Sequence, residues 1–207
     1  MRQLLLDFTQ APAPTFENFV HGGNSELFHV LEGAAAGAAA ERVVYMWGEK
    51  GAGKSHLATA FGDATRGRPG FRVIDGVEAL DDAAQVALFN DFNERAFDFL
   101  LVTASAAPRD VALRRDLATR LATGLTYRVL PLTDEEKRSA LAVHARSRGF
   151  ALSEEVSAYL LTHARRDMGS LMAALDELDR YSLETGRPIT VPLLKAAMQP
   201  QLPIARP

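Results

Sequence analysis

The stretch GEKGAGKS (residues 48–55) is the most informative motif of the sequence. It matches the pattern G-x-x-x-x-G-K-[ST], follows an apolar stretch at residues 43–47, and opens a predicted helix at residues 55–65. Glycines let backbone N–H groups wrap a phosphate, and the N-terminus of the following helix adds a favourable dipole. The stretch therefore predicts a nucleotide-binding loop between a strand and a helix. A chance glycine-rich turn is the alternative, and the flanking strand and helix argue against it.

The residue types in this loop have separate expected roles. Lys54 is expected to reach the β and γ phosphates, and the hydroxyl of Ser55 to ligate Mg²⁺. The other nucleotide-binding positions of the stretch are predicted at Gly48, Gly51, Ala52, Gly53 and His56.

The rest of the chain alternates short apolar runs with helical patterns up to residue 132. Unalternated apolar strands are typical of a parallel sheet buried on both faces, which predicts a doubly wound α/β layer. Strands are expected at 43–47, 71–75, 97–105 and 128–132, and helices near 25–34, 55–65, 83–96 and 110–122. After residue 132 the pattern is wholly helical, beginning with a capping box at Thr133 and Glu136. The expected division is a peptide and linker at 1–14, an α/β core at 15–132, and a helical lid with a tail at 133–207.

A second motif, an apolar strand that ends in an acidic residue, supports the nucleotide site. The run FRVID (residues 71–75) is an apolar strand ending in Asp75, which is expected to hold Mg²⁺ through water. The alternative is an ordinary turn residue at the end of a strand. The next residue is Gly76, where an ATPase usually carries a second acid that orients the attacking water. We therefore expect nucleotide binding with slow or absent hydrolysis of the chain's own nucleotide.

Composition excludes several classes of protein. The 207 residues are 47% hydrophobic and 24% charged, with no cysteine. Disulfides, thiolate metal sites and cysteine catalysis are therefore excluded, and a reducing cytoplasm is expected. No apolar run reaches the length of a membrane span, and no secretion signal is apparent. The net charge is −3, yet residues 101–150 hold 9 basic against 5 acidic side chains.

Taken together, these motifs resemble the AAA+ family, and within it the clade of the bacterial replication initiator DnaA and its small regulatory relatives. The resemblance rests on TFENFV at 15–20 with Asn24, YMWG at 45–48, KSHL at 54–57, DLATRL at 116–121 and RDM at 166–168. It implies an AAA+ three-layer parallel sheet with a small helical lid. It also implies that Asn24 lies beside the nucleotide base, Ser105 stands at the sensor 1 position and Arg166 touches the phosphates.

The same resemblance implies a role for the basic residues at 101–150. It implies that Arg120 is an arginine finger, presented in trans to ATP held by DnaA. Physically, a guanidinium set against a γ phosphate stabilises the charge of the transition state. From the residues alone, an ion pair between Arg120 and Asp116 on an exposed helix face is the simpler interpretation.

The first eight residues form a separate motif. Gln3-Leu4-Leu5-Leu6-Asp7-Phe8 resembles the peptide by which bacterial proteins dock on the sliding clamp of DNA polymerase III. The resemblance implies clamp contacts from Gln3, Leu4, Leu6 and Phe8. The APAP linker that follows would present the peptide away from the domain, whereas packing of the peptide on the core is the alternative.

Two expected absences refine the prediction. Only ten residues follow the last predicted helix, so no helix-turn-helix DNA-binding domain is expected, and DNA would be reached only through the clamp. Only 15 residues separate Ser55 from Phe71, which is too few for the helix, strand and helix of a full AAA+ core. We therefore expect the edge strand of the usual order 5-1-4-3-2 to be missing.

The sequence thus predicts a cytoplasmic bacterial regulator, held near the nucleoid through the clamp, that binds ADP or ATP with Mg²⁺. It would stimulate ATP hydrolysis by DnaA and prevent re-initiation, with weak or no ATPase of its own. Three alternatives stay open: an autonomous ATPase of clamp-loader or helicase-loader type, a small-molecule kinase, and an adaptor that never reaches DnaA. The sequence also leaves open whether the chain forms a homo-oligomer.

Overall fold

The structure, a computed structural model, describes residues 13–165 and 167–198. The described chain divides into two compact units. One is the α/β unit Pro14–Leu132, and the other contains the helices from Thr133 onward.

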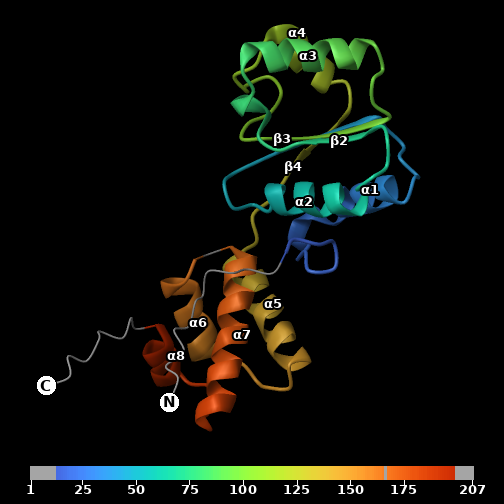
Figure 1. The fold of residues 1–207 in the computed structure, drawn as a ribbon. Coiled ribbons are helices and arrows are strands. Elements are labelled where there is room, and N and C mark those ends of the chain that lie inside the picture. Colours follow the sequence, from blue (N-terminus) through green and yellow to red (C-terminus); the bar gives the residue numbers. More distant parts are fainter. Residues whose placement is uncertain (1–12, 166, 199–207) are drawn as a thin grey trace, which may run out of the picture. The chain divides into compact units, whose positions relative to one another are not determined.

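The α/β unit is built on a parallel sheet of four strands in the order β2-β3-β1-β4. The strands are β1 (Val43–Trp47), β2 (Phe71–Ile74), β3 (Phe99–Ala104) and β4 (Leu125–Arg128). The helices of this unit are α1 (Ser25–Ala35), α2 (Lys54–Ala64), α3 (Asp82–Asn93) and α4 (Arg115–Leu121), with 3-10 turns η1 (Gly22–Asn24) and η2 (Val77–Ala79). Figure 1 shows α1 and α2 on one face of the sheet and α3 and α4 on the other.

Each face of the sheet has its own apolar core. On the α1 and α2 face, Leu31, Leu57 and Phe61 pack on the side chains that β1 and β3 turn towards them. On the α3 and α4 face, Leu88 and Leu117 close over the alternate side chains of the same strands. Every residue of β3 is buried, which explains why its sequence is apolar without alternation, except for Thr103. The predicted three-layer fold is therefore confirmed.

The predicted loss of an edge strand is also confirmed. In the fully described stretch between Lys54 and Phe71 there is one helix, α2, and then a turn. As a result β2 forms an edge of the sheet. An unpaired edge invites association with other strands, and charged side chains reduce that hazard. Here the guanidinium of Arg72 on β2 pairs with the carboxylate of Asp91 on α3.

Two elements differ from their predicted positions. The fourth strand lies at Leu125–Arg128 and not at residues 128–132. It alternates half-buried and exposed residues, as expected of an edge strand, so the apolar run after it was the wrong signal. Pairing does extend one residue further, since the Val129 N–H donates to the Trp47 carbonyl at 2.7 Å. Pro131 has no N–H to continue the ladder.

The predicted helix at 110–122 is shorter than expected, because α4 begins only at Arg115. Residues 107–113 form turns, in which the Asp110 and Val111 N–H groups both donate to the Ala107 carbonyl. The backbone N–H of Arg114 then donates to the side-chain oxygen of the buried Gln85 on α3. This bond holds Arg114 in a non-helical conformation, and α4 begins at the next residue.

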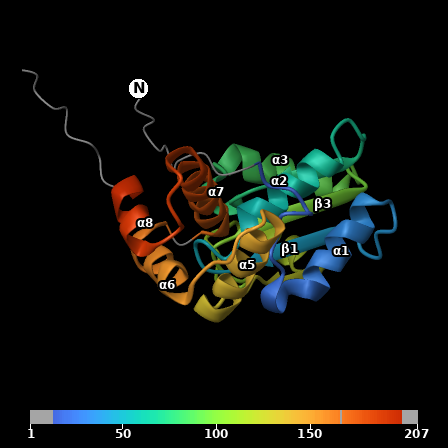
Figure 2. The same cartoon turned by 90° about the horizontal axis from the view of Figure 1, so that it is seen from below.

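In its described residues the second unit contains four helices, which gather around a common apolar core (Figures 1 and 2). They are α5 (Asp134–Ser147), α6 (Glu154–His163), α7 (Met168–Thr185) and α8 (Val191–Met198). The capping box of Thr133 and Glu136 is present, and Gly186 ends α7 in the left-handed conformation. Arg148 ties α5 to α7 through the buried Asp179, with Nε 3.1 Å from Oδ2. Within the described ranges, no helix is long and apolar enough to span a bilayer.

Candidate functional site

The predicted phosphate loop connects β1 to α2, at the carboxyl end of the sheet. The Nζ of Lys54 donates to the carbonyl oxygens of Gly48 and Glu49, at 2.8 and 2.9 Å. The ammonium group is therefore folded over the loop, where neutral carbonyls hold it. An anionic phosphate at this position would compete with those carbonyls for the same hydrogens, because charge-assisted bonds are stronger.

The start of α2 offers further donors. Gly53, the residue before the helix, has a φ of 103° and makes no side-chain cap. The first helical hydrogen bond runs from the Leu57 N–H to the Gly53 carbonyl. The N–H groups of Lys54, Ser55 and His56 precede this bond, so the helical ladder does not use them. Uncapped donors at a helix N-terminus, next to a lysine, fit the phosphates of a nucleotide.

Gly48 is required for a steric reason. A Cβ at this position would lie 2.5 Å from the carbonyl oxygen of Val129, a backbone atom of the neighbouring strand segment. The loop therefore leaves β1 in close contact with the chain that follows β4. This contact fixes where the loop begins.

We expect Gly48→Ala to destabilise the protein by about 1–3 kcal/mol, because the new methyl group meets backbone that cannot rotate away. The free energy of unfolding from urea titration measures the effect. Gly33→Ala is the matched control, since the nearest atom to its Cβ is 3.9 Å away and α1 would gain a better helix former. Equal unfolding free energies for Gly48→Ala and wild type would contradict the steric explanation.

Asp75 follows β2 and lies in the same register as the residues at the end of β3. Its Oδ1 accepts a hydrogen bond from the Thr103 hydroxyl at 2.5 Å. Ser105, the predicted sensor residue, follows the last residue of β3, and its N–H donates to Oε1 of Glu78 at 2.9 Å. The carboxyl ends of β1, β3 and β2 thus bring the phosphate loop, Ser105 and Asp75 to one edge of the sheet, the usual ligand position in such folds.

Position 76 has a conformation that suits glycine. Gly76 has a φ of 74° and a ψ of 63°, in the left-handed region. A glutamate there would be strained, since side chains other than glycine, asparagine and aspartate rarely adopt this conformation. The turn after Asp75 therefore disfavours a glutamate at this position.

Glu78, three residues after Asp75, is a half-buried acid. Among the described residues, its Oε2 is buried without a hydrogen-bond partner, while Oε1 accepts from Ser105. The neighbouring Tyr45 hydroxyl donates to the Ala106 carbonyl at 2.9 Å. Burial, and secondarily the charge of Glu78, raise the pKa of Tyr45. Glu78 thus braces the end of β3.

The segment before α1 packs against the phosphate loop. The ring of Phe19 lies 3.0 Å from the place that a Cβ of Gly53 would occupy. The Nε2 of His56 is 2.9 Å from the Thr15 carbonyl, so His56 holds this segment against α2. The side chain of Asn24 is buried and exchanges two hydrogen bonds with the backbone of Leu130, at 2.9 and 2.8 Å. Asn24 therefore joins η1 to the chain after β4, and its role beside a nucleotide stays a prediction.

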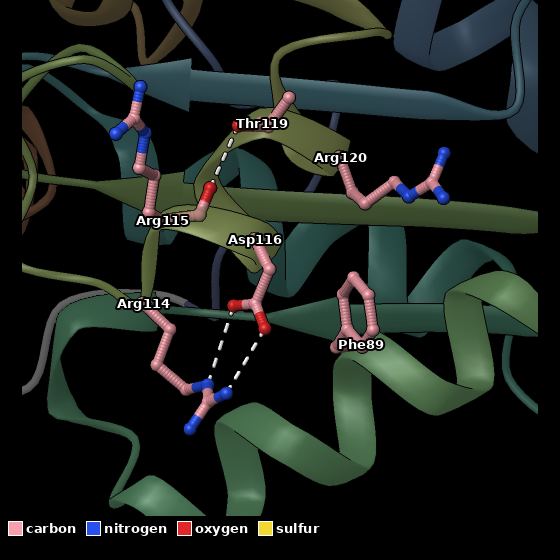
Figure 3. Close-up of a pocket in the computed structure, with 6 residues that line it drawn as sticks. All are labelled: Phe89, Arg114, Arg115, Asp116, Thr119 and Arg120. Atoms are coloured by element: carbon pink, nitrogen blue, oxygen red, sulfur yellow. Dashed lines mark hydrogen bonds and ion pairs between the residues drawn. The ribbon is translucent and has the colours of Figure 1, made fainter.

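Arg120 lies on α4, beside an open pocket of about 720 Å³ between α3 and α4. The pocket is lined by Phe89, Arg114, Arg115, Asp116, Thr119 and Arg120 (Figure 3). The expected simple alternative, an ion pair of Arg120 with Asp116, is not what forms. Asp116 instead accepts from Arg114 at 3.1 and 3.4 Å, and this hydrogen bond lowers the pKa of Asp116.

The guanidinium of Arg120 points away from Asp116 in Figure 3, and it lies 5.9 Å from the centre of the Phe92 ring. Within the described residues, no ion pair of Arg120 is found. Its side chain is exposed. Arg120 thus carries an uncompensated positive charge on the surface of the α/β unit.

Several predicted residues cannot be placed. Gln3, Leu4, Leu6 and Phe8 of the clamp motif, and Arg166 of the lid, lie outside the described residues. Sequence reasoning also missed one residue, Thr103, the polar member of the buried strand β3. A hydroxyl within an otherwise apolar run is the signal that could have identified it.

Comparison with known proteins identifies similar domains for both units of the chain. Residues 134–198 match the family described as Hda, lid domain. The helical unit is thus similar to the lid domain of Hda. The fold of the chain is similar to domain III of the replication initiation protein DnaA from Thermotoga maritima, with a TM-score of 0.70 at 21% identity, over 92% of this chain and 98% of that one.

Two further solved structures share the fold. AMPPCP-bound DnaA from Aquifex aeolicus has a TM-score of 0.67 at 18% identity, and the match covers 85% of this chain and 68% of that one. The RuvB Holliday junction branch migration motor of Thermotoga maritima has a TM-score of 0.65 at 15% identity, over 94% and 72% of the two chains. At these identities the likeness establishes the fold alone.

Proposed function

We propose that the chain is a nucleotide-bound regulator of replication initiation that stimulates ATP hydrolysis by DnaA. The Hda-type lid and the DnaA-like fold support a DnaA-related replication regulator. The observation that carries the finer proposal is Arg120, which is exposed on the short helix α4 and has no acidic partner among the described residues. An arginine presented in this way can complete the nucleotide site of a second AAA+ protein.

The chain's own nucleotide is proposed to bind at the phosphate loop. The AMPPCP of the Aquifex protein belongs to that protein, but the uncapped donors of α2 and the ammonium group of Lys54 suit the same kind of ligand here. Ser55 and Asp75 would hold Mg²⁺ with the phosphates. Mg²⁺ neutralises phosphate charge when bound, and the loop backbone fixes the phosphates in place.

The bound nucleotide is proposed to persist, with ADP as the main occupant after slow turnover. The left-handed turn at Gly76 leaves no acid beside Asp75 to orient water. Oε1 of Glu78 accepts from the Ser105 N–H, and its Oε2 is buried. A stable nucleotide would support the fold and orient the α/β unit for its partner, while the chemistry takes place on DnaA.

The sliding clamp is the proposed anchor. The motif at residues 3–8 would place the protein in the cytoplasm on clamps loaded on DNA, and hence close to the nucleoid. Tethering raises the effective concentration of the protein near DnaA without a new contact between the two.

The experiment compares ATP hydrolysis by DnaA with the whole chain and with a variant lacking residues 3–8, on DNA with and without loaded clamp. We expect the variant to match the clamp-free reaction at low protein concentration, and to recover stimulation at high concentration. Stimulation that is unaffected by loss of residues 3–8 at every concentration would contradict clamp docking.

A further inference from the structure

A buried hydroxyl joins the ends of β2 and β3. Thr103 is 1% exposed, and its Oγ1 lies 2.5 Å from Oδ1 of Asp75. The N–H of Gly76 donates to the same Oγ1 at 2.8 Å. The strand register accounts for this closeness, because Ile74 is paired with Val102, which places Asp75 beside Thr103.

The chemistry of the three groups fixes the direction of each bond. A backbone N–H can only donate, so Gly76 occupies a lone pair of the Thr103 oxygen. The hydroxyl hydrogen is then left for Asp75, whose Oδ1 accepts it. The bond therefore sets the orientation of the Asp75 side chain. Among the described residues, Oδ2 of Asp75 has no hydrogen bond, so that oxygen remains for another ligand.

We propose that Thr103 is a positioning residue that orients the Asp75 carboxylate towards the Mg²⁺ of the bound nucleotide. This inference rests on the proposed nucleotide site. Asp75 itself is exposed and follows the last residue of an edge strand, where its rotamer would otherwise be free. Partners that orient metal ligands typically change metal affinity by 10- to 100-fold when removed, which sets the size of the expected effect.

The structural alternative is that Thr103 only secures the turn at Gly76. That role predicts lower stability and an equal loss of nucleotide affinity with and without Mg²⁺. Positioning of Asp75 predicts instead a loss that requires Mg²⁺. The two roles are therefore separated by the ratio of the nucleotide dissociation constants in EDTA and in Mg²⁺.

Trp47 provides the measurement, because it is the single tryptophan of the chain and directly precedes Gly48. ADP is titrated against wild type, Thr103→Val and Thr103→Ser, in Mg²⁺ and in EDTA. We expect Thr103→Val to lower affinity about tenfold or more in Mg²⁺ and little in EDTA, and Thr103→Ser to restore it. Thr126→Val is the matched control, since Thr126 is exposed on β4. Thr103→Ala replaces the valine variant if that variant does not fold.

A double-mutant cycle with Asp75→Ala tests whether Thr103 acts through Asp75. In that background, Thr103→Val should have no further Mg²⁺-dependent effect. An unchanged ratio in Thr103→Val, or an equal loss in Mg²⁺ and EDTA, overturns the positioning role and leaves the nucleotide site intact. Absence of ADP binding by wild type would overturn the nucleotide site itself, and the positioning role with it.

Discussion

Arg120→Ala is expected to abolish the stimulation of DnaA ATP hydrolysis while leaving nucleotide binding by the chain itself unchanged. An arginine finger supplied in trans raises phosphoryl-transfer rates by about 10³-fold or more, so its removal should return DnaA to its basal rate. The variant should fold normally, because the Arg120 side chain is exposed and its described contact is the Phe92 ring at 5.9 Å. Release of phosphate from DnaA-bound ATP measures the effect.

Arg115→Ala is the matched control for this experiment. Arg115 lies on the same helix and the same pocket, and is also exposed, but its side chain points to the other side of α4 (Figure 3). We expect it to retain most of the stimulation. Equal loss in both variants would indicate general electrostatic attraction between the proteins, whereas full activity of Arg120→Ala would contradict the finger.

Lys54→Ala should weaken ADP and ATP binding about 100-fold or more. The ammonium group now donates two hydrogen bonds to loop carbonyls, and both could be exchanged for bonds to phosphate. A hydrogen bond to a charged group is worth about 1.5–3 kcal/mol, so two of them account for a loss of this size. Trp47 fluorescence or calorimetry measures the dissociation constants.

Lys50→Ala tests whether the loss of nucleotide affinity requires removal of Lys54 itself or follows from removal of any positive charge in the loop. Lys50 is in the same loop and exposed, and no ion pair is found for it within the described residues. The Lys50→Ala variant should bind nucleotide nearly as well as the wild type. Comparable losses for the two lysines would contradict a specific role of Lys54 and favour a general effect of positive charge.

The central features of the fold could be predicted because their signals are local. The loop at 48–55, the apolar strand before it and the shortness of the segment before Phe71 are all readable from adjacent residues, and the structure confirms the strand, the helix and the missing edge strand. The position of β4 was not predictable in this way. An edge strand is buried on alternate residues, so the stronger apolar run at 128–132 obscured it.

The candidate site shows the same limit. The contact of Thr103 with Asp75 joins residues 28 positions apart, and it depends on the register of β2 against β3, which no local pattern gives. The partner of Asp116 could not be predicted from the sequence either. From the residues alone an ion pair with Arg120 is the simpler interpretation, whereas Asp116 accepts from Arg114, the residue directly before α4. That arrangement depends on Gln85 of another helix.

The decisive measurement is the conversion of DnaA-bound ATP to ADP, on DNA carrying loaded clamps, with and without the chain in its ADP-bound form. We expect DnaA to hydrolyse its ATP slowly alone and much faster when the chain is present. An unchanged rate of hydrolysis at saturating concentrations of the chain would contradict this expectation.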